Sequence, residues 1–127
     1  MEDAILNGAK VLVLEDDAFI NLSTTEMIEA MGCIVRPFMR LSDALASISV
    51  HLPDVAVLDV NINGRMSYEL AQLLVERQVP IIFVTGYDSS ALEEKWRRNP
   101  ICQKPCNENA LRQLLIQALV IRRSVKA

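Results

Sequence analysis

The sequence predicts an α/β fold in which five short strands alternate with helices, a (βα)5 arrangement that forms a doubly wound, five-stranded parallel sheet. Two observations carry this prediction. Short apolar runs rich in Val, Ile and Leu recur along the chain, and segments with helical periodicity separate them. The runs are almost continuously apolar, which is typical of strands that helices cover on both faces. With 127 residues, 51% of them hydrophobic, the chain is long enough for a single core.

The predicted strands are short and rich in residues branched at Cβ, which favour extended backbone. They are the runs Val11–Leu14, Ile34–Val35, Val55–Leu58 and Ile81–Val84, and a weaker run at Ile101–Gln103. Because a helical segment separates each strand from the next, the connections are crossovers and the sheet is expected to be parallel.

The predicted helices follow from capping residues and from the spacing of apolar side chains. The first begins after Asp17 and ends at Gly32. The others begin after the N-caps Ser42, Ser67 and Asn107. The apolar faces are Phe19, Leu22, Met27, Ile28 and Met31 in the first helix, Leu70, Leu73 and Leu74 in the third, and Leu111, Leu114, Leu115, Ala118 and Leu119 in the last.

The composition argues against several classes of function. Sixteen acidic and 13 basic side chains give a net charge of -3 without a basic stripe, so we expect no nucleic-acid binding. No apolar run approaches the ~20 residues needed to span a membrane, and the N-terminus lacks the features of a signal peptide. The three cysteines, Cys33, Cys102 and Cys106, form no CxxC pair, so we expect reduced thiols in a cytoplasmic protein.

Polar residues follow four of the predicted strands at the point where each strand ends. Glu15-Asp16-Asp17 follows the first strand, Asp59 the third, Thr85-Gly86 the fourth and Lys104-Pro105 the fifth. In open α/β sheets the ligand crevice lies beyond the carboxyl ends of the strands. A carboxylate is costly to bury, so the position of Asp59 directly after four apolar residues indicates a functional site.

These side chains suit phosphoryl chemistry. The carboxylates of Glu15, Asp16 and Asp59 would repel one another unless a cation lay among them. With no His or Cys nearby in the sequence, hard oxygen ligands favour Mg²⁺, for which Mn²⁺ can substitute. Lys104 suits an anionic oxygen and Thr85 offers a hydroxyl donor. Asp59 is the natural nucleophile, because carboxylates can form aspartyl phosphates.

The motifs "VLVLEDD" and "LDVNING" resemble those of the receiver domain of two-component response regulators, which has a flavodoxin-like fold, and the match covers nearly the whole chain. The resemblance implies that Asp59 is the phosphoacceptor and that the metal ligands are Glu15, Asp16, Asp59 and Asn61. In this assignment Asp16 coordinates the metal directly, Glu15 acts largely through water, and Asn61 contributes its backbone carbonyl.

The resemblance extends to the last two strands, where Thr85 matches the hydroxyl residue and Lys104-Pro105 the Lys-Pro pair, with a cis peptide implied. Asp59, Lys104 and Thr85 would then form the catalytic set. Two positions depart from the pattern of most receivers. Asn63 stands where most have a proline, and Ile101 stands where most have Tyr or Phe.

The segment between the fourth strand and Lys104 is short for the family. "PIIFVTGYD" resembles the fourth strand of the single-domain "FAT GUY" subgroup of receivers. Only "ALEEKWRRN" can be helical there, about two turns, so we expect a shortened fourth helix of low stability. We expect Thr85, Gly86, Tyr87 and Ile101 to form the switch, and residues 86–100 to be the most mobile part of the unphosphorylated domain.

The same residues allow three other functions to be considered. A haloacid-dehalogenase-type phosphatase also uses an aspartate nucleophile with Mg²⁺, but it would need a second aspartate where this chain has Asn61. A flavodoxin-like cofactor binder would need a phosphate-binding loop after the first strand, where this chain has acidic residues. A degenerate receiver that acts as a phosphorylation-independent interaction module stays open as the alternative.

The sequence thus predicts a stand-alone receiver domain over residues 1–127, with no output domain in the chain. Its expected partners are a sensor histidine kinase or a histidine phosphotransfer protein, from which Asp59 takes the phosphoryl group in a Mg²⁺-dependent reaction. Output is expected through a downstream protein target or by acting as a phosphate sink. The domain would not be an enzyme beyond its own phosphorylation and dephosphorylation.

Overall fold

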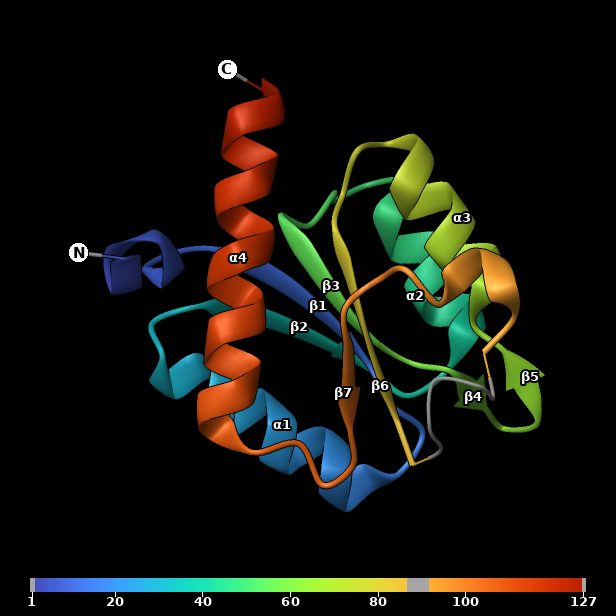
Figure 1. The fold of residues 1–127 in the computed structure, drawn as a ribbon. Helices are drawn as coiled ribbons and strands as arrows, with labels where there is room; N and C mark the ends of the chain where they lie inside the picture. The colour runs from blue at the N-terminus through green and yellow to red at the C-terminus, as the bar shows by residue number, and fades with distance from the viewer. Residues whose placement is uncertain (1, 87–91, 127) are drawn as a thin grey trace.

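The computed structural model describes residues 2–86 and 92–126 and shows a parallel sheet with helices on both faces (Figure 1). Its strands are β1 (Lys10–Leu14), β2 (Ile34–Phe38), β3 (Val55–Asp59), β6 (Ile81–Thr85) and β7 (Ile101–Gln103), in the spatial order β2-β1-β3-β6-β7. All neighbouring strands are parallel. The predicted five-stranded, doubly wound sheet is therefore confirmed. Its strand order reverses at β1 and β3, which is where such sheets bind ligands.

The helices form two layers around the sheet (Figure 1). Side chains of α1 (Ala18–Ala30) and α4 (Glu108–Lys126) pack on one face, and the 3-10 helix η1 (Glu2–Leu6) joins them. Side chains of α2 (Leu41–Ile48) and α3 (Tyr68–Glu76) pack on the other, together with the 3-10 helix η3 (Glu94–Trp96). A two-stranded antiparallel hairpin, β4 (Asn61–Ile62) and β5 (Arg65–Met66), follows β3 and was not predicted.

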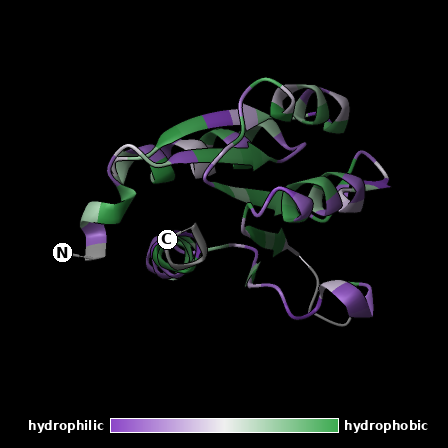
Figure 2. Ribbon diagram, turned by 90° about the horizontal axis from the view of Figure 1, so that it is seen from above, coloured by the Kyte–Doolittle hydropathy of each residue, from purple (hydrophilic) through white to green (hydrophobic). Residues whose placement is uncertain are grey.

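Both faces of the central strands are buried, as the continuous apolar runs predicted. In β3, Val55 and Val57 face the α1/α4 layer, whereas Ala56 and Leu58 face the α2/α3 layer. Successive side chains point to opposite faces of a strand, so one short run supplies both cores. Figure 2 shows the strands largely in green, the colour of hydrophobic residues. Central strands buried in this way can expose polar residues only at their ends.

The caps of the helices were predicted with mixed success. Asp17 caps α1 by accepting a hydrogen bond of 3.0 Å from the Ile20 N–H, and Asn107 caps α4 by accepting one of 2.7 Å from the Ala110 N–H. Ser67 precedes α3, but its hydroxyl makes no capping bond. The prediction for Ser42 was wrong, because α2 already begins at Leu41 and Ser42 lies inside the helix.

The inward face of α1 also differs from the prediction. Phe19 is 86% exposed and Leu22 is 56% exposed, whereas Asn21, Thr25 and Ile28 are buried. Hydrogen bonds of Asn21 explain this orientation. Its side-chain amide donates to two backbone carbonyls, those of Glu15 and Phe38, both at 2.9 Å. The start of α1 therefore turns a hydrogen-bonding residue toward the sheet and its apolar residues outward.

The expected two-turn fourth helix is absent from residues 92–99, where the structure has only the single turn η3. The expected apolar anchors Leu92 and Trp96 are nevertheless buried. The Glu93 N–H donates to the Tyr68 hydroxyl at 3.1 Å, and the Trp96 ring stacks on the Tyr68 ring with centroids 5.6 Å apart. Contacts with α3 therefore hold this segment where a short helix would be marginal.

Candidate functional site

The polar residues at four strand ends meet at one edge of the sheet. Glu15 follows β1, Asp59 ends β3, Thr85 ends β6 and Lys104 follows β7. Because β1, β3, β6 and β7 are parallel, their carboxyl ends lie at the same edge. The Lys104 backbone N–H donates to the Thr85 carbonyl at 2.8 Å, which extends the pairing of β6 and β7 to the lysine. The sheet topology thus builds the cluster that the sequence predicted.

Three carboxylates form the centre of the site. Oxygen atoms of Glu15, Asp16 and Asp59 all lie within 4.8 Å of one another. Glu15 is 4% exposed and Asp59 is 9% exposed, so neither carboxylate is well solvated by bulk water. Close, buried like charges repel strongly, and this arrangement requires nearby cations.

Lys104 supplies one such cation. Its Nζ lies 2.6 Å from Oε1 of Glu15 and 3.0 Å from Oδ2 of Asp59. Burial alone lowers the pKa of Lys104, but the hydrogen bonds to Glu15 and Asp59 outweigh it and hold that pKa above its ordinary value. The ammonium group is therefore charged at neutral pH. One ammonium facing three carboxylates still leaves a formal charge of about -2 for a further cation to offset.

The two acidic residues after β1 have different environments. Burial raises the pKa of Glu15 above its ordinary value, although hydrogen bonds from Lys104 and from the Asp17 N–H oppose this effect. Burial also acts to raise the pKa of Asp16, but a hydrogen bond from the Asn63 N–H contributes to a net lowering. Asp16 is therefore the more strongly ionised of the pair, and it lies closer to solvent.

A tight turn between β4 and β5 faces Asp16. Asn63 and Gly64 both have left-handed backbone, with φ of 52° and 85°. The Asn61 side-chain oxygen accepts a hydrogen bond of 2.9 Å from the Gly64 N–H and stabilises the turn. Since its side-chain oxygen is engaged there, the backbone carbonyl of Asn61 is the better candidate ligand for a metal.

The left-handed turn explains why Asn63 stands where most receivers have a proline. Asn63 has a φ of 52° and donates its N–H to Oδ2 of Asp16 at 2.9 Å. Proline fixes φ near -65° and has no N–H, so it could do neither. Asparagine tolerates left-handed backbone better than most other residues. The departure from proline is visible in the sequence, but its role is not, because the left-handed backbone at Asn63 is seen only in the structure.

The proposed switch residues are placed only in part. The Thr85 side chain is buried at the end of β6, and Gly86 follows it. Ile101 begins β7 opposite Phe83 and packs against the α2/α3 core rather than in the acidic cluster. Tyr87 lies outside the described residues.

The cysteine prediction was wrong for two of the three residues. Cys102 and Cys106 form a disulfide, and only Cys33 is a free, buried thiol. The chain reverses direction around Lys104 and Pro105, which brings the Cα atoms of the two cysteines to 5.7 Å, a normal disulfide separation. The peptide bond between Lys104 and Pro105 is cis, as the resemblance implied. A spacing of four residues across a Lys-Pro turn was the signal that sequence reasoning overlooked.

Comparison with known proteins identifies the family. The model of the response regulator receiver domain matches residues 11–116. The chain belongs to this family. Receiver domains of two-component systems are signalling modules, and the acidic cluster described above is the kind of site at which they bind Mg²⁺. Within residues 2–86 and 92–126, every helix is too short or too polar to cross a membrane.

Two relatives agree with this assignment, and a solved structure has the same fold. The chain is 30% identical over 95 residues to the sensory transduction protein LytT of Bacillus anthracis, covering 66% of this chain and 36% of LytT. It is 27% identical over 124 residues to the transcriptional regulatory protein TdiR of Thauera aromatica, covering 94% of this chain and 55% of TdiR. The chain thus spans about half or less of the length of these relatives. A CheY-like receiver domain from Methylobacillus flagellatus has the same fold, with a TM-score of 0.78, 20% identity, and coverage of 88% of this chain and 99% of that one.

Proposed function

We propose that this receiver accepts a phosphoryl group on Asp59 from a phosphohistidine of a sensor histidine kinase or histidine phosphotransfer protein, in a Mg²⁺-dependent reaction in the cytoplasm. The observation that carries the proposal is the position of the Lys104 ammonium between the carboxylates of Glu15 and Asp59. A degenerate receiver would not need to preserve a buried nucleophile, a buried acid and a lysine in mutual contact. Burying such a cluster lowers the stability of the fold, so its presence supports a functional role.

The acidic cluster fits a magnesium ion. Magnesium prefers oxygen ligands and is commonly bound by one or two carboxylates together with water and phosphate oxygens. Asp16 and Asp59 would bind directly, Glu15 largely through water, and Asn61 through its carbonyl. When bound, the ion supplies positive charge that offsets the charge of the transferring phosphoryl group.

The chain's own residues perform the remaining chemistry. A carboxylate oxygen of Asp59 attacks phosphorus, the new O–P bond forms as the N–P bond breaks, and the histidine nitrogen leaves with the electron pair. Lys104 shifts from the Asp59 carboxylate to an oxygen of the phosphoryl group, and the Thr85 hydroxyl donates to another. The added negative charge at this strand edge then biases the domain toward an active conformation. Output follows through a downstream protein target or through removal of phosphoryl groups from the kinase.

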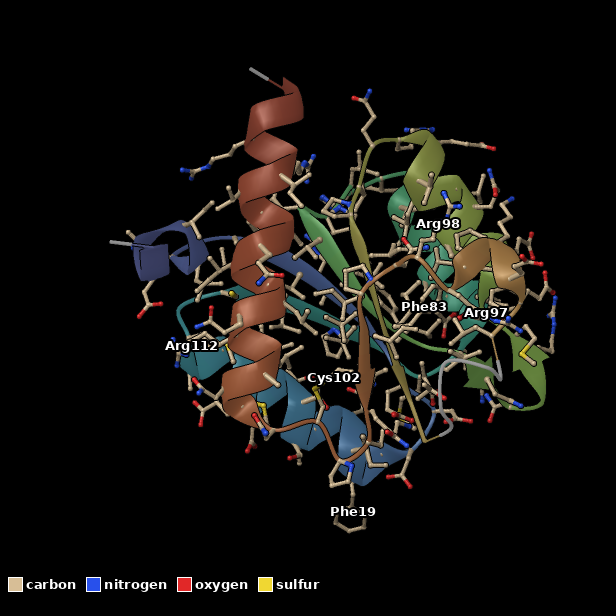
Figure 3. All side chains as sticks on the ribbon, in the orientation of Figure 1. Phe19, Phe83, Arg97, Arg98, Cys102 and Arg112 are labelled. Carbon is tan, nitrogen blue, oxygen red and sulfur yellow. A yellow bond between two sulfur atoms is a disulfide. The ribbon has the colours of Figure 1, made fainter. Side chains whose placement is uncertain are left out.

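The donor protein must cover the surface beside Asp59, and α1 offers an apolar face there. A groove of about 480 Å³ runs beside the site and is lined by Phe19, Ile20 and Met27 of α1, by Lys104, and by Leu111 of α4. Phe19 is 86% exposed and points away from the domain (Figure 3). Because a phosphohistidine has to come within bonding distance of Asp59, we assign this face to the donor protein.

We also propose membership of the "FAT GUY" subgroup. Its support is the sequence Phe83-Val84-Thr85-Gly86-Tyr87 at the end of β6 and the replacement of a regular fourth helix by the single turn η3 within residues 92–99.

The proposal is tested by incubating the protein with Mg²⁺ and acetyl phosphate and measuring its mass. We expect one added phosphoryl group on the wild type, none on Asp59→Asn, and none after Mg²⁺ is removed with a chelator. Asp17→Asn is the matched control, because Asn retains the cap of α1 and residue 17 lies outside the three-carboxylate cluster. A folded wild type that takes up no phosphoryl group from acetyl phosphate or a histidine kinase would favour the degenerate receiver instead.

A further inference from the structure

A disulfide brackets the active-site lysine. The bond joins Cys102 of β7 to Cys106, so that Gln103, Lys104 and Pro105 lie in a closed loop between the two cysteines. Lys104 extends from this loop to Glu15 and Asp59. The covalent link is therefore part of the support of the residue on which the proposed phosphoryl transfer depends.

The two sulfur atoms have different surroundings. Cys102 is 6% exposed, pairs with Val84 in the sheet and belongs to the core beneath α1 and α4 (Figure 3). Cys106 is only partly buried and lines the groove beside α1 together with Lys104 and Pro105. A reagent that enters this groove reaches the Cys106 sulfur first, while Cys102 stays anchored in the core.

Among the described residues, Gln103 pairs with Thr85 at the end of the sheet, and few further contacts hold the backbone of this loop. On one side the Lys104 N–H donates to the Thr85 carbonyl at 2.8 Å, and on the other Asn107 caps α4 through the Ala110 N–H. Between these two points the disulfide ties the backbone to the core. Opening it frees Cys106 to leave the groove wall and increases the conformational entropy of the loop that carries Lys104.

We propose that Cys102 and Cys106 form a redox site that controls the placement of Lys104. In the bridged form the loop is fixed and Lys104 is held over Asp59. In the dithiol form the loop is mobile and phosphoryl transfer to Asp59 slows. The effect on transfer rests on the proposed function, whereas the effect on loop order does not. Disulfides in a reducing compartment are mostly transient and redox-sensing, which fits a bridge beside a signalling residue.

The reductant is a dithiol, either a small molecule or a protein. One of its thiolates attacks Sγ of Cys106, a new S–S bond forms, and the Cys102 sulfur leaves with the electron pair of the broken bond and takes up a proton. The second thiolate of the reductant then attacks its own sulfur in the mixed disulfide and releases Cys106, which is also protonated. In sum, the protein disulfide gains two electrons and two protons, and the dithiol becomes a disulfide.

Cys33 provides an internal control. Burial raises the pKa of Cys33 to about 11, so its sulfur is a protonated, poorly reactive thiol at neutral pH. It is 6% exposed and belongs to the core. Thiol reagents should therefore distinguish Cys33 from the bridged pair, and Cys33→Ala should leave the redox response unchanged.

The test uses the full chain, purified without reductant and divided into untreated and dithiothreitol-treated samples. After unfolding in an alkylating reagent, we expect one labelled cysteine in the untreated sample and three in the reduced one. We expect hydrogen exchange at residues 103–107 to be faster in the reduced form. With Mg²⁺ and acetyl phosphate, the reduced form should be phosphorylated about tenfold more slowly, within the ~10²-fold that a 1 Å misplacement can cause. Cys106→Ser should behave like the reduced form and should not respond to dithiothreitol.

Two results would overturn the redox site itself. One is three free thiols in the untreated protein even after mild oxidation with a disulfide reagent. The other is equal exchange at residues 103–107 in the bridged and reduced forms. If exchange differs but neither form takes up phosphate, the redox site stands and the phosphoryl-transfer function fails. If both forms are phosphorylated at the same rate, the receiver function stands and the control of Lys104 is refuted.

Discussion

The backbone N–H of Asn63 donates a 2.9 Å hydrogen bond to Oδ2 of Asp16, and this bond joins the turn after β3 to the acidic end of β1. The bond requires a residue at position 63 that has an N–H and accepts a φ of 52°. It orients the carboxylate that we assign as the direct metal ligand. The identity of residue 63 should therefore affect metal binding although its side chain is not a ligand.

We predict that Asn63→Pro weakens Mg²⁺ binding, whereas Asn63→Gly retains it. Proline removes the N–H and cannot adopt the left-handed backbone conformation. Glycine keeps the N–H and adopts this conformation readily. A hydrogen bond to a charged group contributes about 1.5–3 kcal/mol, so we expect the dissociation constant to rise roughly tenfold or more in the proline variant. Titration calorimetry measures both variants. Equal affinities for Mg²⁺ would show that the Asn63 N–H does not position Asp16.

Lys104 should give the folded protein a characteristic dependence on pH. Burial lowers the pKa of Lys104, but the hydrogen bonds to Glu15 and Asp59 raise it above that of an unfolded chain. The folded state therefore binds the proton more tightly. The resulting stabilisation is fully present below the unfolded pKa of about 10.4 and is lost as the pH rises through the folded pKa.

The measurement is urea unfolding between neutral pH and the highest pH at which the fold persists. Wild type should lose more stability at high pH than Lys104→Met, which has no proton to release. Lys10→Met is the matched control, because Lys10 is exposed at the opposite end of β1 and should leave the wild-type profile unchanged. Parallel profiles for wild type and Lys104→Met would show that the two ion pairs contribute little in solution.

The centre of the site could be predicted because only strand order along the chain was needed. Once β1, β3, β6 and β7 are parallel, the residues after them must share one edge, whatever the details of packing. Asp59 and Lys104 are 45 positions apart in sequence, yet this rule placed both at the same edge of the sheet. The periodicity of the apolar runs was sufficient to establish it.

The supporting residues could not be predicted in the same way, because they depend on local backbone angles or on partners distant in sequence. The role of Asn63 depends on a left-handed φ that no apolar pattern reports. The burial of Asn21, a polar residue, depends on two carbonyl partners that lie 6 and 17 residues away in the sequence. The apolar character of Phe19 suggested burial, but a helix that turns a polar residue inward has to expose its neighbours.

The exposure of Phe19 leads to a prediction about the donor protein. Phe19→Ala should slow phosphoryl transfer from a histidine kinase but leave the reaction with acetyl phosphate unchanged, because the small donor needs no protein surface. Loss of one anchoring aromatic residue commonly weakens an interface by about 2 kcal/mol or more, which corresponds to roughly 30-fold. Leu22→Ala is the matched control, since Leu22 is also an exposed apolar residue of α1 but does not line the groove. An equal slowing of transfer from the kinase in both variants, or no slowing in either, would show that the groove is not part of the interface.

The last prediction concerns the segment after β6, whose described part is residues 92–99. Trp96 stacks on Tyr68 and meets Phe83 edge-on at a centroid distance of 5.8 Å. Phe83 lies two residues before Thr85 on β6, so we expect a movement of Thr85 toward a phosphoryl group to be transmitted through the strand to the Trp96 ring. Trp96 is the only tryptophan in the sequence, and tryptophan fluorescence therefore reports the surroundings of this one ring.

We expect Mg²⁺ with beryllium fluoride, a phosphoryl mimic, to change the Trp96 fluorescence and to slow hydrogen exchange across residues 92–99, whereas Mg²⁺ alone should do neither. The described segment has a single helical turn and few contacts with α3, among them the bonds from the Glu93 N–H to the Tyr68 hydroxyl and from the Lys95 ammonium to the Gln72 side chain, so it should open readily before activation. Tyr68→Phe retains the stacked ring but removes this bond, and should speed exchange in the metal-only state while preserving the fluorescence response. Strong protection of residues 92–99 already present with Mg²⁺ alone would show that the aromatic contacts hold the segment in one state and that it is not part of the switch.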